Sequence, residues 1–373
     1  MLKLKKKIQK YFKSIGYILF KILYGKVEDV IDPNKQNDIS TELVKIDNKF
    51  LYKFYKVENG RLYTDRINNT AIIKNNKIVE GPSFQYRTLN SEIINAVARE
   101  NIVLVNGTPR LQKKIKGTVL SLLTGGAGND NYWHWIFDVL PRLAICEKKI
   151  NLSSIDYFLL PDNKKKFQTE SLKELGIPKE KQISSIDYRH IIADNLYITT
   201  HPVVLSENAT QDIQNIPEWI SPWLKEKFLK NKPNKEKKFP KKIYLDRSDS
   251  KSNVKNLRSV TNENEVKKYL SGKGFEMIKL TELYFKDQAL TFNNADVIVG
   301  LHGAGFANVA FCKPNTKIIE ISANPLDNVI KSLSLKNNLD HKTLSNENNI
   351  TTQQNQFGHI KVSIDQLNRI IQL

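Results

Sequence analysis

Residues 296–308 read DVIVGLHGAGFAN: a run of apolar residues, a histidine, and two glycines separated by one alanine. An uninterrupted apolar run of this length is typical of a strand buried on both faces of a parallel sheet. The two glycines favour a tight turn from that strand into a short helix. The alternation continues on both sides, with strands expected at 243–245, 275–280 and 317–321 and helices at 266–270 and 284–293. The pattern predicts a doubly wound parallel sheet, which binds ligands beyond the carboxyl ends of its strands.

The residues before position 225 contain a second region of strands and helices. Strands are expected at 118–123 and 157–160 and helices at 131–148 and 170–175, after short strands and turns over 40–110 that include a hairpin at 71–80. Lysines and prolines dominate residues 225–242, a composition typical of an exposed linker. The chain is therefore expected to form two α/β halves joined near residue 235.

Composition excludes several classes of protein. The chain has 373 residues, of which 40% are hydrophobic, and this is enough to bury two cores and excludes a disordered chain. Two cysteines cannot build a disulfide scaffold, and no apolar run is long enough for a membrane span. The net charge of +19 is concentrated in residues 1–26, with eight lysines and no acid, and in residues 225–242, with nine lysines. Because the remainder is nearly balanced, no basic groove for nucleic acid is expected.

The N-terminal 26 residues have the pattern of an amphipathic helix. Apolar residues recur at steps of three and four from Leu4 to Leu23, with most of the lysines elsewhere on the helix. Such a helix can lie on a membrane with its lysines on anionic headgroups. The alternatives are a helix packed on the protein's own body and a targeting segment, although no signal-peptide cleavage site follows.

The turn after the central strand could hold a phosphate or diphosphate. Backbone can approach a ligand closely at Gly303 and Gly305, on either side of Ala304, and the following helix offers N–H groups and a partial positive charge. Asn308 takes the place of the third glycine of a dinucleotide-binding motif, so that fold is not indicated. The alternative is that the glycines only allow tight packing and that His302 is a structural histidine.

Charged residues near the ends of the predicted strands would complement such a ligand. Arg247 and Arg258 follow the strand at 243–245, and a guanidinium binds phosphate oxygens through two parallel hydrogen bonds, although both could be solvated loop residues. Glu320 is expected to end the last strand of this half, where a carboxylate can accept both hydroxyls of a ribose.

In the first half, the candidate for acid–base chemistry is the stretch NYWHWIFDVLPRL at 131–143. His134 and Asp138 are four residues apart and would share one face of a helix. Either the histidine, oriented by the carboxylate, or the aspartate itself could take a proton from an incoming hydroxyl; a capped structural histidine is the alternative. The pair lacks the third ligand of a metal site. Trp133 and Trp135 flank His134 on opposite sides, so one is expected in the core and one beside a pocket, where its flat face suits a sugar.

Three motifs are absent. No D-x-D carboxylate pair is present to hold a metal–diphosphate complex, so no metal or other cofactor is required, although stimulation by a divalent cation stays open. The lack of GxxxxGK[ST] excludes a P-loop NTPase, and the lack of GxSxG weakens an esterase interpretation of the glycine turn.

Taken together, the sequence resembles glycosyltransferase family 61, which includes bacterial capsular polysaccharide biosynthesis proteins. The resemblance is carried by the segment at 131–143, by YLDRSDSKSNVKNLRSVTNENEV at 244–266 and by FKDQALTFNNADVIVGLHGAGFANVAFCKPNTKIIEI at 285–321. It implies an α/β GT-B-like fold, two facing Rossmann-like domains with a cleft between them. It also implies an inverting transfer without a D-x-D metal. Arg247, Arg258 and the residues from His302 to Gly305 would then line the donor diphosphate, with Glu320 near the nucleoside and His134 and Asp138 opposite.

The expected organisation is a membrane-surface helix at 1–26, an acceptor-side domain at 27–235, a donor domain at 236–345, and a tail with a helix at 346–373 that packs back on the first domain. The expected function is transfer of a sugar from a nucleotide-diphosphate sugar, UDP being the first candidate, to a hydroxyl of a glycan or glycolipid. The protein would work in capsular or surface polysaccharide synthesis on the cytoplasmic face of the cell membrane. The alternative is a non-catalytic nucleotide- or sugar-binding partner of an assembly complex.

Overall fold

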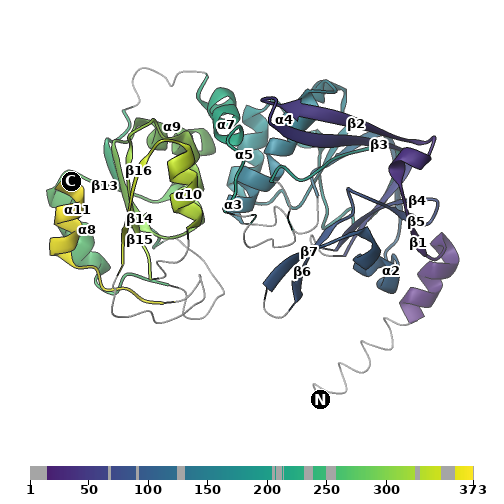
Figure 1. The fold of residues 1–373 in the computed structure, drawn as a ribbon, viewed down its shortest axis with the longest axis horizontal. Helices are drawn as coiled ribbons and strands as arrows, with labels where there is room; N and C mark the ends of the chain where they lie inside the picture. The colour runs from purple at the N-terminus through teal and green to yellow at the C-terminus, as the bar shows by residue number, and fades with distance from the viewer. Residues whose placement is uncertain are drawn as a thin grey trace, which may run out of the picture. The chain divides into compact units, whose positions relative to one another are not determined.

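A computed structural model describes residues 15–65, 69–89, 92–123, 131–203, 206, 212, 214–230, 238–248, 258–323, 328–345 and 358–372. Contacts within the chain divide it into two compact units. Unit 1 comprises Met1–Thr169 and Gly176–Asp212, and unit 2 comprises Glu170–Leu175 and Ile213–Leu373. Each unit contains a sheet with helices packed on it (Figure 1).

Unit 1 is built on one large mixed sheet. Its strand order is β1-β5-β4-β3-β11-β8-β9-β10, with β2 paired to β3. The strands are β1 (Asp29–Ile31), β2 (Ile39–Ile46), β3 (Phe50–Thr64), β4 (Thr70–Lys74), β5 (Lys77–Val79), β8 (Lys113–Ser121), β9 (Tyr157–Leu160), β10 (Gln182–Ser184) and β11 (His190–Thr199). A separate hairpin is formed by β6 (Gln85–Leu89) and β7 (Glu92–Ala96). The buried side chains of β3, β8 and β11 form the main core of the unit.

This mixed sheet differs from the Rossmann-like domain that the sequence predicts. Strands β8, β9, β10 and β11 are parallel to their neighbours, but β2, β3, β4 and β5 pair antiparallel. The reason is local: β2–β3 and β4–β5 are joined by two-residue turns at Asp47–Asn48 and Asn75–Asn76, all four with positive φ. Such turns join antiparallel strands, whereas parallel strands need long crossovers. The hairpin predicted at 71–80 is confirmed.

The helices of unit 1 are short. They are residues 15–24, α2 (Ile102–Asn106), α3 (Tyr132–His134), the π-helical turn η3 (Trp135–Val139), α4 (Pro141–Glu147) and α5 (Lys166–Glu174), together with the 3-10 turns η1 (Pro33–Lys35), η2 (Ala98–Glu100), η4 (Leu152–Ser154) and η5 (Lys179–Lys181). The helix predicted at 131–148 is thus present with a π-turn inside it. Pro141 has no N–H to continue the α-helical pattern, and the N–H of Leu140 donates to the carbonyl of Trp135, five residues back.

Unit 2 contains the predicted doubly wound parallel sheet. Its strand order is β13-β12-β14-β15-β16, and every neighbouring pair is parallel. The strands are β12 (Lys242–Leu245), β13 (Glu276–Ile278), β14 (Val297–Leu301), β15 (Lys317–Ile321) and β16 (Asp340–Leu344). The apolar run that opens the sequence argument is β14, the central strand. Glu320 is not on the last strand, because β16 follows β15 in the sequence and in the sheet.

Helices cover both faces of this sheet (Figure 1). They are α7 (Ile220–Leu229), α8 (Glu263–Gly272), α9 (Phe285–Asn294), α10 (Val329–Lys336) and α11 (Ile364–Gln372), with the 3-10 segments η6 (Leu280–Glu282) and η7 (Ala304–Phe311). Apolar side chains of α8 and α11 pack in one core with β12, β14 and β15. Phe228 of α7 packs edge to face on Phe285 of α9 and on Phe311 of η7.

Two segments lie elsewhere than the sequence predicts. Residues 214–230 belong to unit 2, because α7 packs on α9 and η7, whereas the expected boundary was near 235. The C-terminal segment was expected to return to the first half, and this is wrong for residues 358–372. They pack within unit 2: Leu367 is buried in its core, and the hydroxyl of Tyr269 donates to Oδ1 of Asn368 (2.6 Å). The amide oxygen of Asn262 accepts the N–H of Val362 (2.9 Å), so it anchors this segment instead of capping α8.

Close packing of β12 on β14 gives the first testable prediction. Gly300 pairs with Leu245, and a Cβ atom at Gly300 would lie 2.9 Å from the Cβ of Leu245, which is too close. Gly300→Ala is therefore expected to lower the free energy of unfolding of unit 2 by about 1–3 kcal/mol. Gly272→Ala is the control, because nothing lies within 4 Å of its Cβ position. Urea denaturation should show an unchanged or slightly raised midpoint for the control; equal midpoints for the two variants would contradict the packing argument.

Candidate functional site

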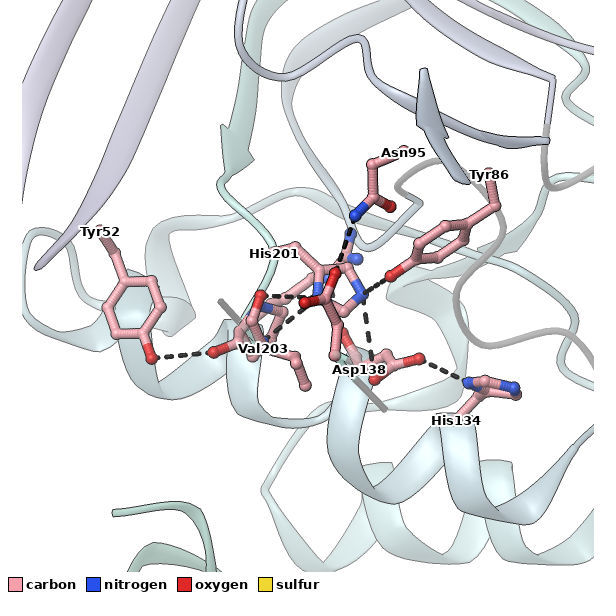
Figure 2. Close-up of polar contacts among 10 residues, drawn as sticks. Tyr52, Tyr86, Asn95, His134, Asp138, His201 and Val203 are labelled. Carbon is pink, nitrogen blue, oxygen red and sulfur yellow. Dashed lines mark hydrogen bonds and ion pairs between the residues drawn. The ribbon is translucent and has the colours of Figure 1, made fainter. Parts of the chain in front are cut away.

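The His134–Asp138 pair lies where α3 passes into the π-turn (Figure 2). Nδ1 of His134 is 2.6 Å from Oδ2 of Asp138, so the pair predicted from the spacing is in direct contact. The Asn131 side chain accepts the N–H of Trp133 (2.9 Å) and starts this helical segment. The side chain of His134 is 24% exposed and that of Asp138 only 7%. The imidazole is therefore the part of the pair that solvent or a substrate can reach.

A second histidine, which the sequence argument missed, lies on the other side of Asp138 (Figure 2). His201 follows β11, and its Nε2 is 3.8 Å from Oδ1 of Asp138 and 3.4 Å from the hydroxyl of Tyr86. The N–H of Val203 donates to Nδ1 of the same ring (3.1 Å). Asp138 thus lies between two imidazoles. The only sequence signal for this partner is a lone histidine shortly after an apolar strand, which is too weak to predict a contact.

The segment after His201 is held by further polar contacts (Figure 2). The hydroxyl of Tyr52 donates to the carbonyl of Pro202 (2.8 Å). The side chain of Asn95 on β7 donates to Oδ2 of Asp212 (2.8 Å), and the N–H of Ser206 donates to the same carboxylate. These contacts fix the ring of His201 from two different strands.

Burial and charge act in opposite directions on the pKa values of this cluster. Burial alone would raise the pKa of Asp138, but the charges of His201, His134 and Arg142 and the hydrogen bond from His134 together lower it. Burial would lower the pKa of His134, but the charge and hydrogen bond of Asp138 raise it above its usual value. Burial and the nearby Arg142 guanidinium lower the pKa of His201 to about 4, so His201 is neutral at physiological pH. The result is a buried carboxylate anion that orients one accessible imidazole.

Arg142, also missed by the sequence argument, contributes to this cluster from α4. Its side chain is fully buried, and Nε donates to the carbonyl of Asp138 (2.7 Å). Burial lowers the pKa of Arg142 to about 10, which still leaves it charged at neutral pH. The positive charge helps to keep Asp138 ionised.

The two tryptophans beside His134 are both buried. Trp135 is completely buried and packs on Phe167, with ring centroids 6.2 Å apart. Trp133 is 8% exposed and packs on Phe137 at 4.7 Å. Of the two residues predicted to border a pocket, only Trp133 keeps exposed surface, and Trp135 is a core residue.

In unit 2 the glycine turn and Arg247 come together. NH1 of Arg247 donates to the carbonyl of His302 (2.6 Å). A Cβ atom at Gly303 would lie 2.7 Å from this nitrogen, so the missing side chain makes room for the guanidinium. Asn308 is buried, and its side chain donates to the carbonyl of Gly305 (3.2 Å), which closes the turn. Asn308 therefore shapes the turn from inside.

The predicted site residue Glu320 is buried beneath this turn. Both of its oxygens contact histidines: Oε1 accepts from Nδ1 of His302, and Oε2 lies 2.8 Å from Nε2 of His341 on β16. Burial alone would raise the pKa of Glu320, but these hydrogen bonds and the charges of the histidines lower it. Because Glu320 is only 1% exposed, it acts on the site through His302 and has no free oxygen for a ribose. His341 is a further residue that the sequence argument missed.

The remaining candidate, Arg258, is partly buried and lies immediately after residues 249–257, which are outside the described residues. It is close in sequence to Val260, which forms a parallel bridge with Ile360. The glycine loop predicted at 125–128 also falls outside the described residues. Within the described ranges, no group of three or more histidine, cysteine, aspartate or glutamate side chains is arranged to hold a metal ion. No helix in those ranges is long and apolar enough to cross a membrane.

Comparison with protein families places both groups of site residues in one class. The model of glycosyltransferase family 61 matches residues 132–319, which is half of the chain and spans the His134–Asp138 pair, Arg247 and the glycine turn. The chain belongs to glycosyltransferase family 61, as its resemblance to that family predicted, and is a glycosyltransferase. A comparison with curated proteins gave no match.

The coupled His134–Asp138 pair predicts a specific dependence of stability on pH. The lowered pKa of Asp138 contributes stability that is present above its ordinary pKa of about 4 and is lost as the pH falls through the folded-state value. The raised pKa of His134 contributes stability that is present below its ordinary value of about 6.5 and is lost as the pH rises through the folded-state value. Asp138→Asn should therefore lower the free energy of unfolding most between pH 4 and 6.5, by about 1.5–3 kcal/mol.

Urea denaturation of the wild type and Asp138→Asn from pH 3 to pH 8 measures this difference. Asp296→Asn is the matched control, because Asp296 is exposed and makes only a surface ion pair with Lys241. A difference between wild type and Asp138→Asn that stays constant over the whole pH range would show that the pair is not coupled in this way.

Proposed function

We propose that the protein is an inverting glycosyltransferase that transfers a sugar from a nucleotide-diphosphate sugar to a hydroxyl of a glycan or glycolipid. UDP-sugars are the first donors to test, and synthesis of a capsular or other surface polysaccharide is the proposed role. The observation that carries the proposal is the contact between His134 and Asp138 inside the segment that matches the family. The two facing domains of a GT-B-like fold are part of the proposal.

The geometry favours His134 as the base. A general base must reach the proton that it removes, and Asp138 is buried with its pKa lowered, whereas the imidazole is accessible with its pKa raised toward and above neutrality. Asp138 accepts the Nδ1–H of His134, which leaves Nε2 unprotonated and able to accept a proton. Asp138 is therefore a positioning residue that sets the tautomer and orientation of the ring.

The proposed reaction is a single displacement. Nε2 of His134 takes the proton of the acceptor hydroxyl as its oxygen forms a bond to the anomeric carbon of the donor sugar. The bond from that carbon to the diphosphate oxygen breaks on the opposite face, and the nucleoside diphosphate leaves with the electron pair. The configuration of the sugar is inverted, and no cofactor is needed to balance the step. Whether a divalent cation stimulates it is decided by assay with and without magnesium.

In unit 2, the proposed donor site consists of Arg247, Arg258 and the turn from His302 to Gly305. Arg247 lies against the turn, and its guanidinium carries fixed positive charge toward the place where a diphosphate would sit. Backbone N–H groups in the first turn of η7 add hydrogen-bond donors. Such preorganised charge stabilises the leaving group as its negative charge develops.

The test of the catalytic assignment is the pH dependence of kcat/KM with the donor that the enzyme uses. For the wild type, activity should rise with pH as His134 loses its proton, at a pKa above its ordinary value of about 6.5. Asp138→Asn removes the charge that raises this pKa, so the rise should move to lower pH while the rate falls by about 10²–10⁴. His134→Gln should lose activity at every pH.

Two outcomes would redirect the assignment. If His134→Gln keeps its activity and Asp138→Asn loses it at every pH, Asp138 is the base. If the wild type binds a nucleoside diphosphate but turns over none of its sugars, not even by slow hydrolysis, the non-catalytic alternative is favoured. Asp296→Asn again serves as the control for an exposed aspartate.

We further propose that the N-terminal helix attaches the enzyme to the cytoplasmic face of the cell membrane. Within residues 15–24 the apolar side chains are exposed, Ile22 the most at 76%; the others are Ile15, Ile18, Leu19 and Leu23. The end of the helix is anchored to unit 1, because the carbonyl of Tyr24 accepts from Arg61 (3.1 Å) and its hydroxyl accepts the N–H of Gln112 (3.0 Å). An anchored helix with an exposed apolar surface and many lysines suits an anionic lipid surface.

Flotation with vesicles of phosphatidylcholine and phosphatidylglycerol tests the membrane proposal. The double variant Ile18→Gln/Ile22→Gln should reduce the bound fraction about tenfold or more, because two apolar side chains no longer insert. Leu335→Gln, at an exposed apolar position of α10, is the control and should bind as the wild type does. Equal binding by the double variant, or equal binding to vesicles without anionic lipid, would contradict the proposal.

A further inference from the structure

His341 and Glu320 form a buried pair directly behind His302. Glu320 lies on β15 and His341 on β16, and the strand register pairs His341 with Ile318, two residues before Glu320 on the same face of the sheet. The side chains of Glu320 and His341 are only 1% and 2% exposed. Neither can touch a ligand in the folded protein, so any effect on a ligand must pass through His302.

The geometry fixes the carboxylate on both sides. One oxygen of Glu320 accepts from His302 and the other lies 2.8 Å from Nε2 of His341. A carboxylate held at one oxygen can still rotate, but one held at both oxygens cannot without losing a buried hydrogen bond. His341 therefore determines the orientation of Glu320, and Glu320 determines the orientation of the His302 ring.

The backbone of His302 is fixed as well, so the ring direction is the remaining freedom. Its N–H donates to the carbonyl of Ile321 (2.8 Å), and its carbonyl accepts from Arg247 (2.6 Å). With Nδ1 turned to Glu320, Nε2 is the ring nitrogen left for a ligand. A phosphate oxygen accepts hydrogen bonds, so this contact needs a proton on both nitrogens, and the carboxylate balances the positive charge of such a ring.

We infer that His341 is a positioning residue of the donor site, which acts through Glu320 to aim Nε2 of His302 at the diphosphate of the nucleotide. The inference rests on the proposed function, because it takes a nucleoside diphosphate as the ligand. It assigns a role to a residue outside the segment that the family model matches. It also gives Glu320 a role in place of the expected contact with the nucleoside.

The experiment is a double-mutant cycle on the dissociation constant, measured by calorimetry with the nucleoside diphosphate, among UDP, GDP, CDP and ADP, that the wild type binds most tightly. His341→Leu removes the donor to Glu320 and should weaken binding about tenfold, as for one misplaced hydrogen bond to a charged group. His341→Gln keeps an N–H at the same reach and should restore binding to within about threefold. Lys342→Leu is the control, because this neighbour on β16 is exposed and pairs with Asp340.

The decisive comparison uses a protein that lacks the His302 ring. If His341 acts through His302, then His341→Leu should have little further effect in a His302→Ala background, so the two losses are not additive. A merely structural role would give additive losses, and Gln would rescue no better than Leu at equal melting temperature. Either result, or unchanged binding in His341→Leu, overturns the inference alone. If the wild type binds none of the four diphosphates, the proposed donor class falls and the inference falls with it.

Discussion

Burying a carboxylate is the constraint on which both groups of site residues depend. An isolated carboxylate removed from water is so costly that it either takes up a proton or acquires partners. Asp138 and Glu320 acquire partners, and each lies between two histidines: His134 and His201 in unit 1, His302 and His341 in unit 2. In each unit one imidazole is more exposed than the carboxylate. The buried anion thereby fixes the direction of the imidazole that a substrate can reach.

Backbone geometry places these partners. In unit 1 the π-turn before Pro141 is part of the segment that carries Asp138, and the segment after β11 brings His201 to its other side. In unit 2 the parallel register of β14, β15 and β16 sets three side chains of separate strands around Glu320 without any loop. Regular sheet pairing is the more rigid of the two devices, since a shift by one residue would turn Glu320 to the opposite face.

Local patterns in the sequence predict what local physics decides. The apolar run of β14, the hairpin at 71–80 and the four-residue spacing of His134 and Asp138 each depend on neighbours in the chain, and all three are present. Contacts between distant residues could not be predicted: Tyr86, His201 and His341 reach their partners through the fold, and a single histidine carries no periodic signal. The mixed sheet of unit 1 was missed for a different reason. Its two-residue turns predict hairpins one at a time but do not show that β3 continues through Thr64 and joins both sets of strands.

The two carboxylate–histidine groups differ in the charge that surrounds them, and this difference suits different chemistry. Around Asp138 the second histidine is neutral, with a pKa of about 4, and the buried Arg142 supplies the balancing charge. The exposed imidazole of His134 is then free to change its protonation state, as a base must. Around Glu320 both oxygens are engaged by histidines on neighbouring strands, and Arg247 adds a guanidinium at the same turn. Positive groups accumulate there around one buried anion, which is the arrangement that an anionic leaving group requires. One structural device thus serves proton removal in one unit and charge stabilisation in the other, according to which cations lie beside the buried carboxylate.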